Sequence, residues 1–292
     1  MREGTEWKPL PVTGDPHRSV DETELDGVSA QVMDAYVNEL EHTCKRPGLR
    51  SRQSLGTSVP IDGVYWWDEQ QAMIYVSGGR VFQHKNGVLT ERPGTGLSTG
   101  RKVTFATDGT KLVMANGGQM VHMVIDGPLV TMADGDAPPT VSHVAYIDGY
   151  VLANDLGTGQ WHYADPTDLT SWNALDFATA EGKPDTIDAL HVGWGEVALF
   201  GRQSIEFWYN DGVSPFARIN GGVIEDGIEA AYSVGKLLDG WMYLKKDRRF
   251  MRLRGRQPEP VSFPFDRFIQ DLATVEETIA DVIDIAGHLF YV

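Results

Sequence analysis

The sequence lacks the residue patterns on which most enzymes and metal sites depend. It contains no G-x-S-x-G, H-E-x-x-H or P-loop motif, and Gly193-Trp194-Gly195 precedes an apolar stretch typical of a strand rather than a helix. Its eight histidines are spread along the chain without the spacing of metal ligands. We therefore expect no enzymatic activity, no cofactor and no metal centre.

Cysteines, long apolar runs and positive charges are also scarce. Cys44 is the single cysteine, so no intrachain disulfide can form. No apolar run approaches the roughly 18 residues that a membrane-spanning helix needs. The 25 Lys and Arg residues face 41 Asp and Glu residues, which gives a net charge of −16. This charge disfavours nonspecific binding of nucleic acid over the surface as a whole.

What the sequence does contain is a strand-turn-strand pattern that occurs six times. The starts of its second strand are 38, 38, 47, 45 and 47 residues apart: Ile74, Leu112, Tyr150, Val197, Met242 and Leu289. Another apolar strand and a polar or Gly-rich turn precede each of these starts, as in Val144–Ile147 followed by Asp148-Gly149. A period of about 40 to 50 residues with several short strands per unit is typical of a β-propeller.

The predicted fold is therefore all-β, a propeller of about six blades. The second strands are apolar throughout, as expected for strands packed between neighbouring blades, whereas third strands such as Phe250–Arg254 alternate. We predict blades near residues 61–100, 101–140, 141–186, 187–228, 229–272 and 273–292. The last of these units stops inside a strand. Either the first 60 residues supply the missing strands or the sequence is the front part of a longer protein, and we expect the latter.

The first 60 residues are expected to precede the propeller. Residues 1–26 are rich in proline and acids and are predicted to be an extended arm. Residues 28–40 carry apolar side chains at helical spacing and are predicted to form a short helix before Arg46-Pro47-Gly48-Leu49. A second short helix is predicted near 265–272, between blades five and six.

Two features are candidates for contacts with subunits or partners. The segment 245–256 holds seven cations and one acid, whereas the segment 15–41 holds eight acids and one base. We predict that this basic stripe faces the acidic segment of a neighbouring copy in a ring, unless both are simply solvated. The cations are Lys245, Lys246, Arg248, Arg249, Arg252, Arg254 and Arg256.

The aromatic residues offer a second set of candidates. Trp161 and Trp172 lie in the longest insertion and are expected to be exposed. Five other tryptophans lie in or beside predicted strands and are expected to pack in the core: Trp66, Trp67, Trp194, Trp208 and Trp241.

Several stretches resemble a known family. Residues 199–210 (LFGRQSIEFWYN), 218–228 (RINGGVIEDGI), 46–49 (RPGL) and 287–291 (GHLFY) are similar to sequences of the tail hub proteins of short-tailed phages. These are also called packaged-DNA stabilisation proteins or tail accessory factors. The likeness runs from about residue 35 to the end, and the block 199–210 is its most specific part.

The resemblance implies a structural role in the virion tail, with assembly in the host cytoplasm. A hub of this family is a propeller-based subunit present in six copies. It lies below the portal and its adaptor protein, closes the DNA channel without reading sequence, and receives a tail needle, spike or further tail protein. It has no catalytic residues to transfer to this chain.

Two other functions remain open from the residues alone. One is a propeller that binds or cleaves carbohydrate for host recognition, which would place Trp161 or Trp172 and acids in one pocket. The other is a cellular propeller that binds short peptides. A propeller limits the fold strongly and the chemistry weakly, so the repeat itself does not distinguish these functions.

Overall fold

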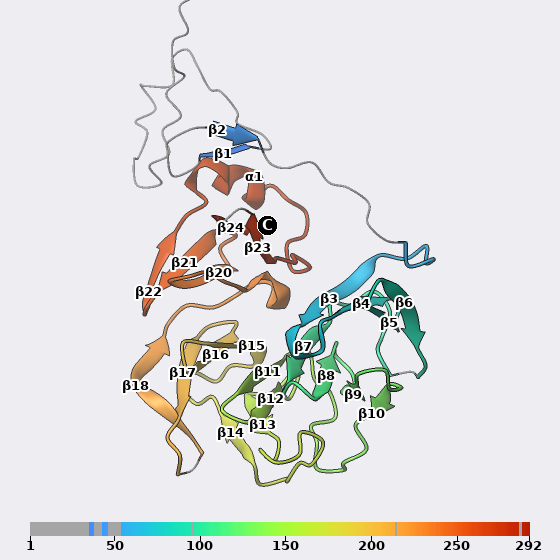
Figure 1. Ribbon diagram of the computed structural model, residues 1–292. Helices are drawn as coiled ribbons and strands as arrows, with labels where there is room; N and C mark the ends of the chain where they lie inside the picture. The colour runs from blue at the N-terminus through green and yellow to red at the C-terminus, as the bar shows by residue number, and fades with distance from the viewer. Residues whose placement is uncertain (1–34, 38–42, 46–53, 95, 214, 286–287) are drawn as a thin grey trace, which may run out of the picture. The chain divides into compact units, whose positions relative to one another are not determined.

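The computed structural model describes residues 35–37, 43–45 and 54–292, apart from residues 95, 214 and 286–287. In this part of the chain, five four-stranded sheets follow one another and a two-stranded sheet ends the series (Figure 1). Each four-stranded sheet is an antiparallel meander whose spatial order is its sequence order. The prediction of an all-β propeller of about six blades is confirmed.

The strands of the first three blades are short. Blade 1 contains β3 (Ile61–Trp67), β4 (Ala72–Ser77), β5 (Arg80–Lys85) and β6 (Val88–Arg92). Blade 2 contains β7 (Thr104–Thr107), β8 (Lys111–Ala115), β9 (Val121–Val124) and β10 (Val130–Thr131). Blade 3 contains β11 (Val144–Ile147), β12 (Tyr150–Asn154), β13 (Gln160–Tyr163) and β14 (Phe177–Thr179).

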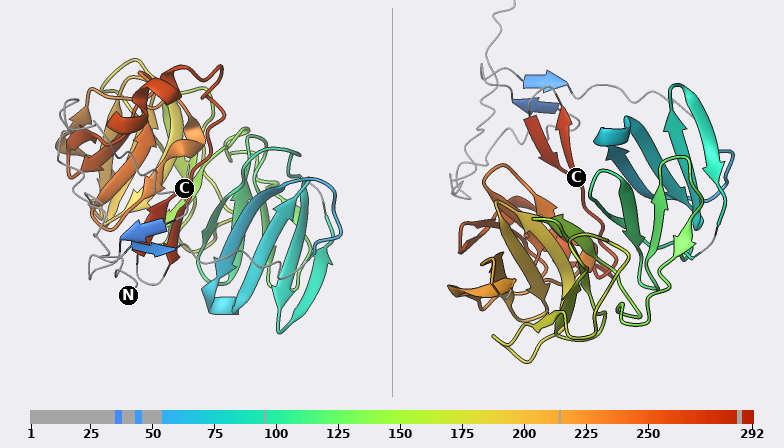
Figure 2. Two further views of the ribbon diagram at one scale, coloured as in Figure 1. Left: turned by 90° about the horizontal axis from the view of Figure 1, so that it is seen from above. Right: turned by 60° about the horizontal axis from the view of Figure 1, so that its bottom comes forward.

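The remaining blades complete the series (Figure 2). Blade 4 contains β15 (Ile187–Gly193), β16 (Glu196–Gly201), β17 (Ile205–Asn210) and β18 (Phe216–Ile224). A 3-10 turn, η3 (Ala231–Ser233), leads into blade 5, which contains β19 (Gly235–Lys236), β20 (Gly240–Leu244), β21 (Phe250–Arg254) and β22 (Gln257–Pro260). Blade 6 contains β23 (Val282–Ile285) and β24 (His288–Tyr291). All six predicted second strands lie in the second strand of a blade.

The even number of strands per blade places equivalent turns on one face. Four antiparallel strands return the chain to its starting side, so the first strands of all blades run in the same direction. The turns between first and second strands, and between third and fourth strands, therefore share a face that we call the hairpin face. Contacts between blades agree with this, because Gln70 Nε2 donates to the Gly109 carbonyl at 2.8 Å and Arg256 pairs with Glu196 at 2.6 Å.

The core consists of apolar layers between neighbouring blades. One cluster joins Val113 of blade 2 to Val151 of blade 3, and another joins Ala198 of blade 4 to Tyr243 of blade 5. All residues from Val197 to Gly201 in the second strand of blade 4 are buried. A strand that is covered on both faces can be apolar at every position, which confirms the sequence-based expectation for the second strands.

Buried polar residues end two of the second strands and hold the links between blades. The side chain of Asn154, at the end of β12, accepts from the Ser142 and His143 amides at 3.1 and 2.9 Å. It also donates to the Ile187 carbonyl at 3.1 Å, where blade 4 begins. Asn116, directly after β8, has a similar place and exchanges two hydrogen bonds with Ser98. These amides satisfy backbone groups that the sheets leave unpaired.

The segment before blade 6 holds the predicted short helix. A 3-10 turn, η4 (Phe263–Phe265), continues into α1 (Asp266–Gln270), which confirms the helix expected near 265–272. The chain then reaches the two-stranded blade 6, and Tyr291 of β24 packs edge-on against Phe250 at 5.7 Å. Among the described residues, blade 6 has two strands, as the incomplete sixth unit of the sequence indicates.

A second, smaller unit is described by itself. It contains β1 (Ala35–Val37) and β2 (Thr43–Lys45), which pair antiparallel with Tyr36 opposite Cys44. The helix predicted over 28–40 is therefore wrong at Ala35–Val37, because aromatic and β-branched side chains favour pairing with a second strand over helical spacing. The arm 1–26 and the rest of the acidic segment 15–41 lie outside the described residues.

Candidate functional site

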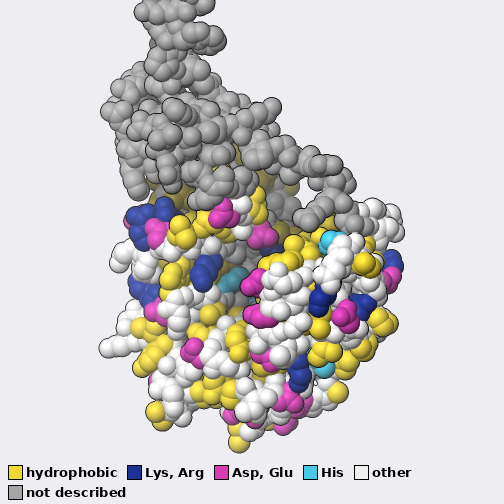
Figure 3. Space-filling model, in the orientation of Figure 1, with side chains coloured by type: hydrophobic (Ala, Val, Ile, Leu, Met, Phe, Trp, Pro, Cys, Tyr) yellow, Lys and Arg dark blue, Asp and Glu magenta, His cyan; other side chains and the backbone are white. Residues whose placement is uncertain are grey.

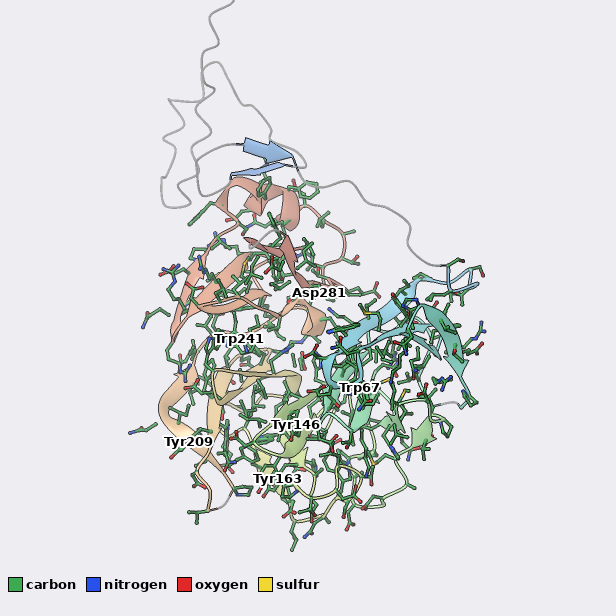
Figure 4. The ribbon with its side chains drawn as sticks, viewed as in Figure 1. Trp67, Tyr146, Tyr163, Tyr209, Trp241 and Asp281 are labelled. Carbon is green, nitrogen blue, oxygen red and sulfur yellow. The ribbon has the colours of Figure 1, made fainter. Side chains whose placement is uncertain are left out.

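A large cavity of the propeller unit lies among the first strands of blades 1 to 4. It has a volume of about 1040 Å³ and is lined by β3, β7, β11, β15 and residues 279–281 near the C-terminus. Figure 3 shows the hollow and a histidine side chain within it. Figure 4 marks Tyr146 on β11 and Asp281 before β23, two lining residues that are far apart in the sequence. The lining therefore depends on the arrangement of several blades.

Three basic side chains meet in this cavity. The Lys102 ammonium donates to the Ala280 carbonyl at 2.5 Å and so links blade 2 to the segment that enters blade 6. The rings of His143 and His191 are 5.5 Å apart, and Tyr232 stacks on His143 at 4.9 Å. His143 Nδ1 lies 2.9 Å from the Ser142 hydroxyl, whereas His191 Nε2 is buried with no hydrogen-bond partner among the described residues.

Burial lowers the pKa of each of these three groups. Desolvation, together with the nearby Lys102 charge, lowers the pKa of His191 to about 4. Desolvation also holds the pKa of His143 well below its ordinary value, with His191 and Lys102 acting in the same direction. The pKa of Lys102 is lowered by burial, although Asp281 partly offsets this shift. Both imidazoles are therefore neutral at pH 7.

The chemistry that this cavity offers is limited. Asp62, Glu69 and Asp281 line it together with Lys102, so its charge is negative at neutral pH. Within the described residues, no group of three His, Cys, Asp or Glu side chains is placed to hold a metal ion.

No helix in that same part of the chain is long and apolar enough to cross a membrane.

The predicted basic stripe is largely neutralised within the chain. Arg252 and Arg254 both pair with Asp239, at 2.7 and 3.1 Å. Lys245 pairs with the buried Asp226 at 3.2 Å. Arg252 and Arg254 lie on β21, and Lys245 lies in the turn before it. Because alternate side chains of a strand point to the same side, these cations face acids of the same blade and its neighbour.

The other cations of the stripe have similar partners. Arg248 donates to the Gln270 and Leu272 carbonyls, and Arg249 pairs with Asp266 at 3.2 Å. Arg256 lies 3.6 Å above the Phe207 ring and pairs with Glu196. Lys246 is exposed and has no ion-pair partner among the described residues. The structure thus brings six of the seven predicted contact residues into intrachain interactions.

The two tryptophans predicted to be exposed are buried. Trp161 is 0% exposed and packs edge-on against Trp208 and Phe216 between blades 3 and 4. Trp172 is 5% exposed, and its backbone amide donates to Asp134 at 2.9 Å. The prediction is wrong because Trp161 lies on β13 and packs between blades 3 and 4, whereas the segment that holds Trp172 folds back over blades 2 and 3.

Two tryptophans expected in the core are exposed instead. Trp67 and Trp241 are buried, as predicted, but Trp66 and Trp194 are 46% and 51% exposed. Trp194 lies at the turn between β15 and β16, with a left-handed φ of +54°. The Trp-Gly pair is the sequence signal for this exposure, because it lies at a hairpin turn. The equivalent turn of blade 3 has Asp-Gly.

Comparison with known families decides the affiliation of the chain. The model of the family described as "Bacteriophage P22 Gp10, beta-propeller" matches residues 32–250, which is most of the sequence. The chain belongs to this phage family. The match covers blades 1 to 4 and part of blade 5, and it includes the stretches 199–210 and 218–228 on which the resemblance rests. No curated protein matches the sequence.

Solved structures are similar in fold at low sequence identity. The extracellular domain of BT4673 from B. thetaiotaomicron has a TM-score of 0.54 and 9% identity, over 83% of this chain and 33% of that one. The β-propeller domain of Myceliophteria thermophila Cps50 (Swd1) has a TM-score of 0.52 and 10% identity, over 72% and 74%. BamB from Moraxella catarrhalis has a TM-score of 0.45 and 14% identity, over 68% and 60%. These likenesses concern the fold alone.

Proposed function

We propose that this chain is a structural subunit of a phage virion, the hub of a short tail. In this role it extends and closes the DNA channel below the portal and its adaptor and helps to retain packaged DNA. The observation that carries the proposal is the match to the phage P22 Gp10 β-propeller family across residues 32–250. The role requires no catalysis and no cofactor.

The size of the cavity bears on how such a hub would hold DNA. A sphere with the volume of about 1040 Å³ is about 13 Å across, whereas the major groove of B-DNA alone is about 12 Å wide. A cavity about as wide as one groove leaves no room for the two strands that flank that groove, so this cavity does not hold a duplex. The DNA channel of the proposed hub would lie between copies of the chain arranged in a ring, which we propose to contain six copies.

The charge of the chain is compatible with a channel wall. A net charge of −16 repels the phosphate backbone, so the duplex would slide past the ring without sticking. The proposed partners are the adaptor above the ring and a tail needle, spike or further tail protein below it. DNA would be a neighbour in the channel that is not recognised by sequence.

The carbohydrate-binding alternative has lost its main support. It required Trp161 or Trp172 to be exposed beside acids, but both side chains are buried between blades. Its former candidate residues therefore cannot stack on a sugar in the folded chain.

Electron microscopy of the native assembly tests the hub proposal most directly. The expected result is a ring of this chain on the axis of a DNA channel, with its propellers around that axis. A propeller that lies off the axis, or that occurs as a single copy on the particle surface, would overturn the proposal.

A further inference from the structure

The hairpin face presents aromatic rings where the fold does not need them. Trp66, Tyr146 and Trp194 are 46%, 37% and 51% exposed, and each lies at or next to the turn after the first strand of its blade. The three come from blades 1, 3 and 4. Large aromatic side chains exposed at turns on one face of a propeller are typical of a surface for a partner rather than of a core.

Trp194 is also held in a backbone conformation that disfavours it. Its φ is +54° and that of Gly195 is +77°, which form a two-residue turn between β15 and β16. The equivalent turn of blade 3 has Asp148 at +50°, and Asn86 adopts +51° in the last turn of blade 1, although the longer Gln71 and Arg248 are also left-handed, at +49° and +63°. Asn, Asp and Gly tolerate this region, whereas a bulky side chain is strained in it. Because Asn or Asp would fold more easily here, the tryptophan indicates a function other than folding.

The surroundings of the Trp194 ring show what it can bind. Lys236 Nζ lies 5.0 Å from the ring centroid, and Trp241 supports the ring edge-on at 5.3 Å. The ring thus already accepts one cation from its own chain while half of its surface stays open. An indole face attracts ammonium and guanidinium groups through its quadrupole.

Carboxylates accompany the other two rings. Trp66 donates its Nε1 hydrogen to Asp68 at 3.0 Å, and Glu69 follows in the same turn. Asp148 is exposed two residues after Tyr146, with no ion-pair partner among the described residues. Ring faces beside carboxylates match arginine, whose planar group can stack and form an ion pair at the same time. The basic stripe of a second copy is a poorer match, because all of its cations except Lys246 already have partners within their own chain.

We propose that the hairpin face binds a basic, arginine-containing segment of a partner protein, with Trp194 as an anchor. The inference does not depend on the hub proposal, because it rests on exposed rings, a strained turn and nearby carboxylates of this chain alone. A ring assembly that fails to appear would leave it standing.

The test is the substitution Trp194→Asn in the full chain. Asparagine suits the left-handed turn, so we expect a melting temperature that is unchanged or higher. The probe is a labelled octapeptide that alternates arginine and glycine, and its binding is followed by fluorescence anisotropy at low salt. We expect at least a tenfold loss of affinity for the peptide, although the charge of the chain is unaltered.

Matched charge variants separate a site from general attraction to an acidic protein. Asp148→Asn on the hairpin face is expected to weaken peptide binding severalfold, whereas Glu277→Gln, in the link between blades 5 and 6 on the other face, is not. Equal affinity of the wild-type chain and Trp194→Asn would overturn the proposal. Equal losses in the two charge variants would also overturn it, because they would show nonspecific attraction.

Discussion

At the scale of single residues, the neutral state of the two cavity histidines makes stability depend on pH. The unfolded chain binds a proton to His191 near its ordinary pKa of 6.5, but the folded chain does so only near pH 4. Stability is therefore fully present above about pH 6.5 and is lost as pH falls toward 4. We expect His191 to contribute about 3 kcal/mol to the whole loss, of which about 2 kcal/mol falls between pH 7 and pH 5. Urea unfolding at these two pH values measures this part.

The variant His191→Gln provides the comparison. Glutamine cannot take up the proton, so its free energy of unfolding should fall less between pH 7 and pH 5 than that of the wild-type chain. His143, whose pKa is also lowered, would account for the part that remains. An identical pH dependence in both proteins would contradict this account of His191.

Exposure of individual side chains is what the sequence predicts least well. Trp172 lies in an insertion and Trp194 lies beside a strand, yet the first is buried and the second is exposed. Position relative to a strand does not fix exposure, because an insertion can fold back over neighbouring blades and a turn can hold its side chain outward. The Trp-Gly pair in the sequence indicates a turn at Trp194, but it does not by itself specify the left-handed backbone conformation of that turn.

At the scale of elements, the two buried asparagines at the ends of second strands should differ in importance. Asn154 bonds two backbone amides and the carbonyl of the next blade, whereas Asn116 bonds one residue. We expect Asn154→Ala to lower the free energy of unfolding by about 3 kcal/mol and Asn116→Ala by about 1 to 2 kcal/mol. Urea unfolding of both variants measures the difference. Equal losses would show that the link into blade 4 does not depend on Asn154.

Strands were predictable because their signal is local. Paired glycines such as Gly78-Gly79, and the apolar second strands, recur at blade-sized intervals and specify a meander whatever the partner blades are. The helix expected over 28–40 fails at Ala35–Val37 for the opposite reason. A strand of three residues is too short to show an alternating pattern in the sequence. The helical spacing of the surrounding apolar residues therefore dominates the prediction, although pairing with a second strand determines the structure.

At the scale of the whole molecule, the role of the basic stripe in assembly is best tested at Lys246, because its other cations also support the fold. Arg252→Glu with Arg254→Glu would place three acids together at Asp239, so we expect a lower melting temperature. Lys246→Glu changes an exposed cation and should leave the melting temperature unchanged. If the stripe contacts a neighbouring copy, sedimentation of the assembly should show weaker association in Lys246→Glu. Association equal to that of the wild-type chain would rule out this lysine as a contact.

The cavity could not be predicted because its lining belongs to the assembled blades. Lys102 and Ala280 are hydrogen-bonded although 178 residues separate them. Periodicity and motifs in a sequence do not identify contacts between residues that are so far apart. The arrangement of blades decides which polar residues of the first strands meet, and burial then sets their charge.

The same Lys102–Ala280 hydrogen bond should determine how firmly the C-terminal segment is held. Lys102→Met keeps the length of the side chain and removes the ammonium, whose charged hydrogen bond stabilises by about 1.5 to 3 kcal/mol. We expect the Ala280 and Asp281 amides, which donate to Tyr232 and Val292, to exchange hydrogen about tenfold to a hundredfold faster. Amides of β12 and β16 should keep their protection. Because the variant also removes a desolvated charge, its overall stability can stay unchanged while the C-terminal segment opens more often. Uniform acceleration in all blades would instead show that Lys102 supports the propeller as a whole.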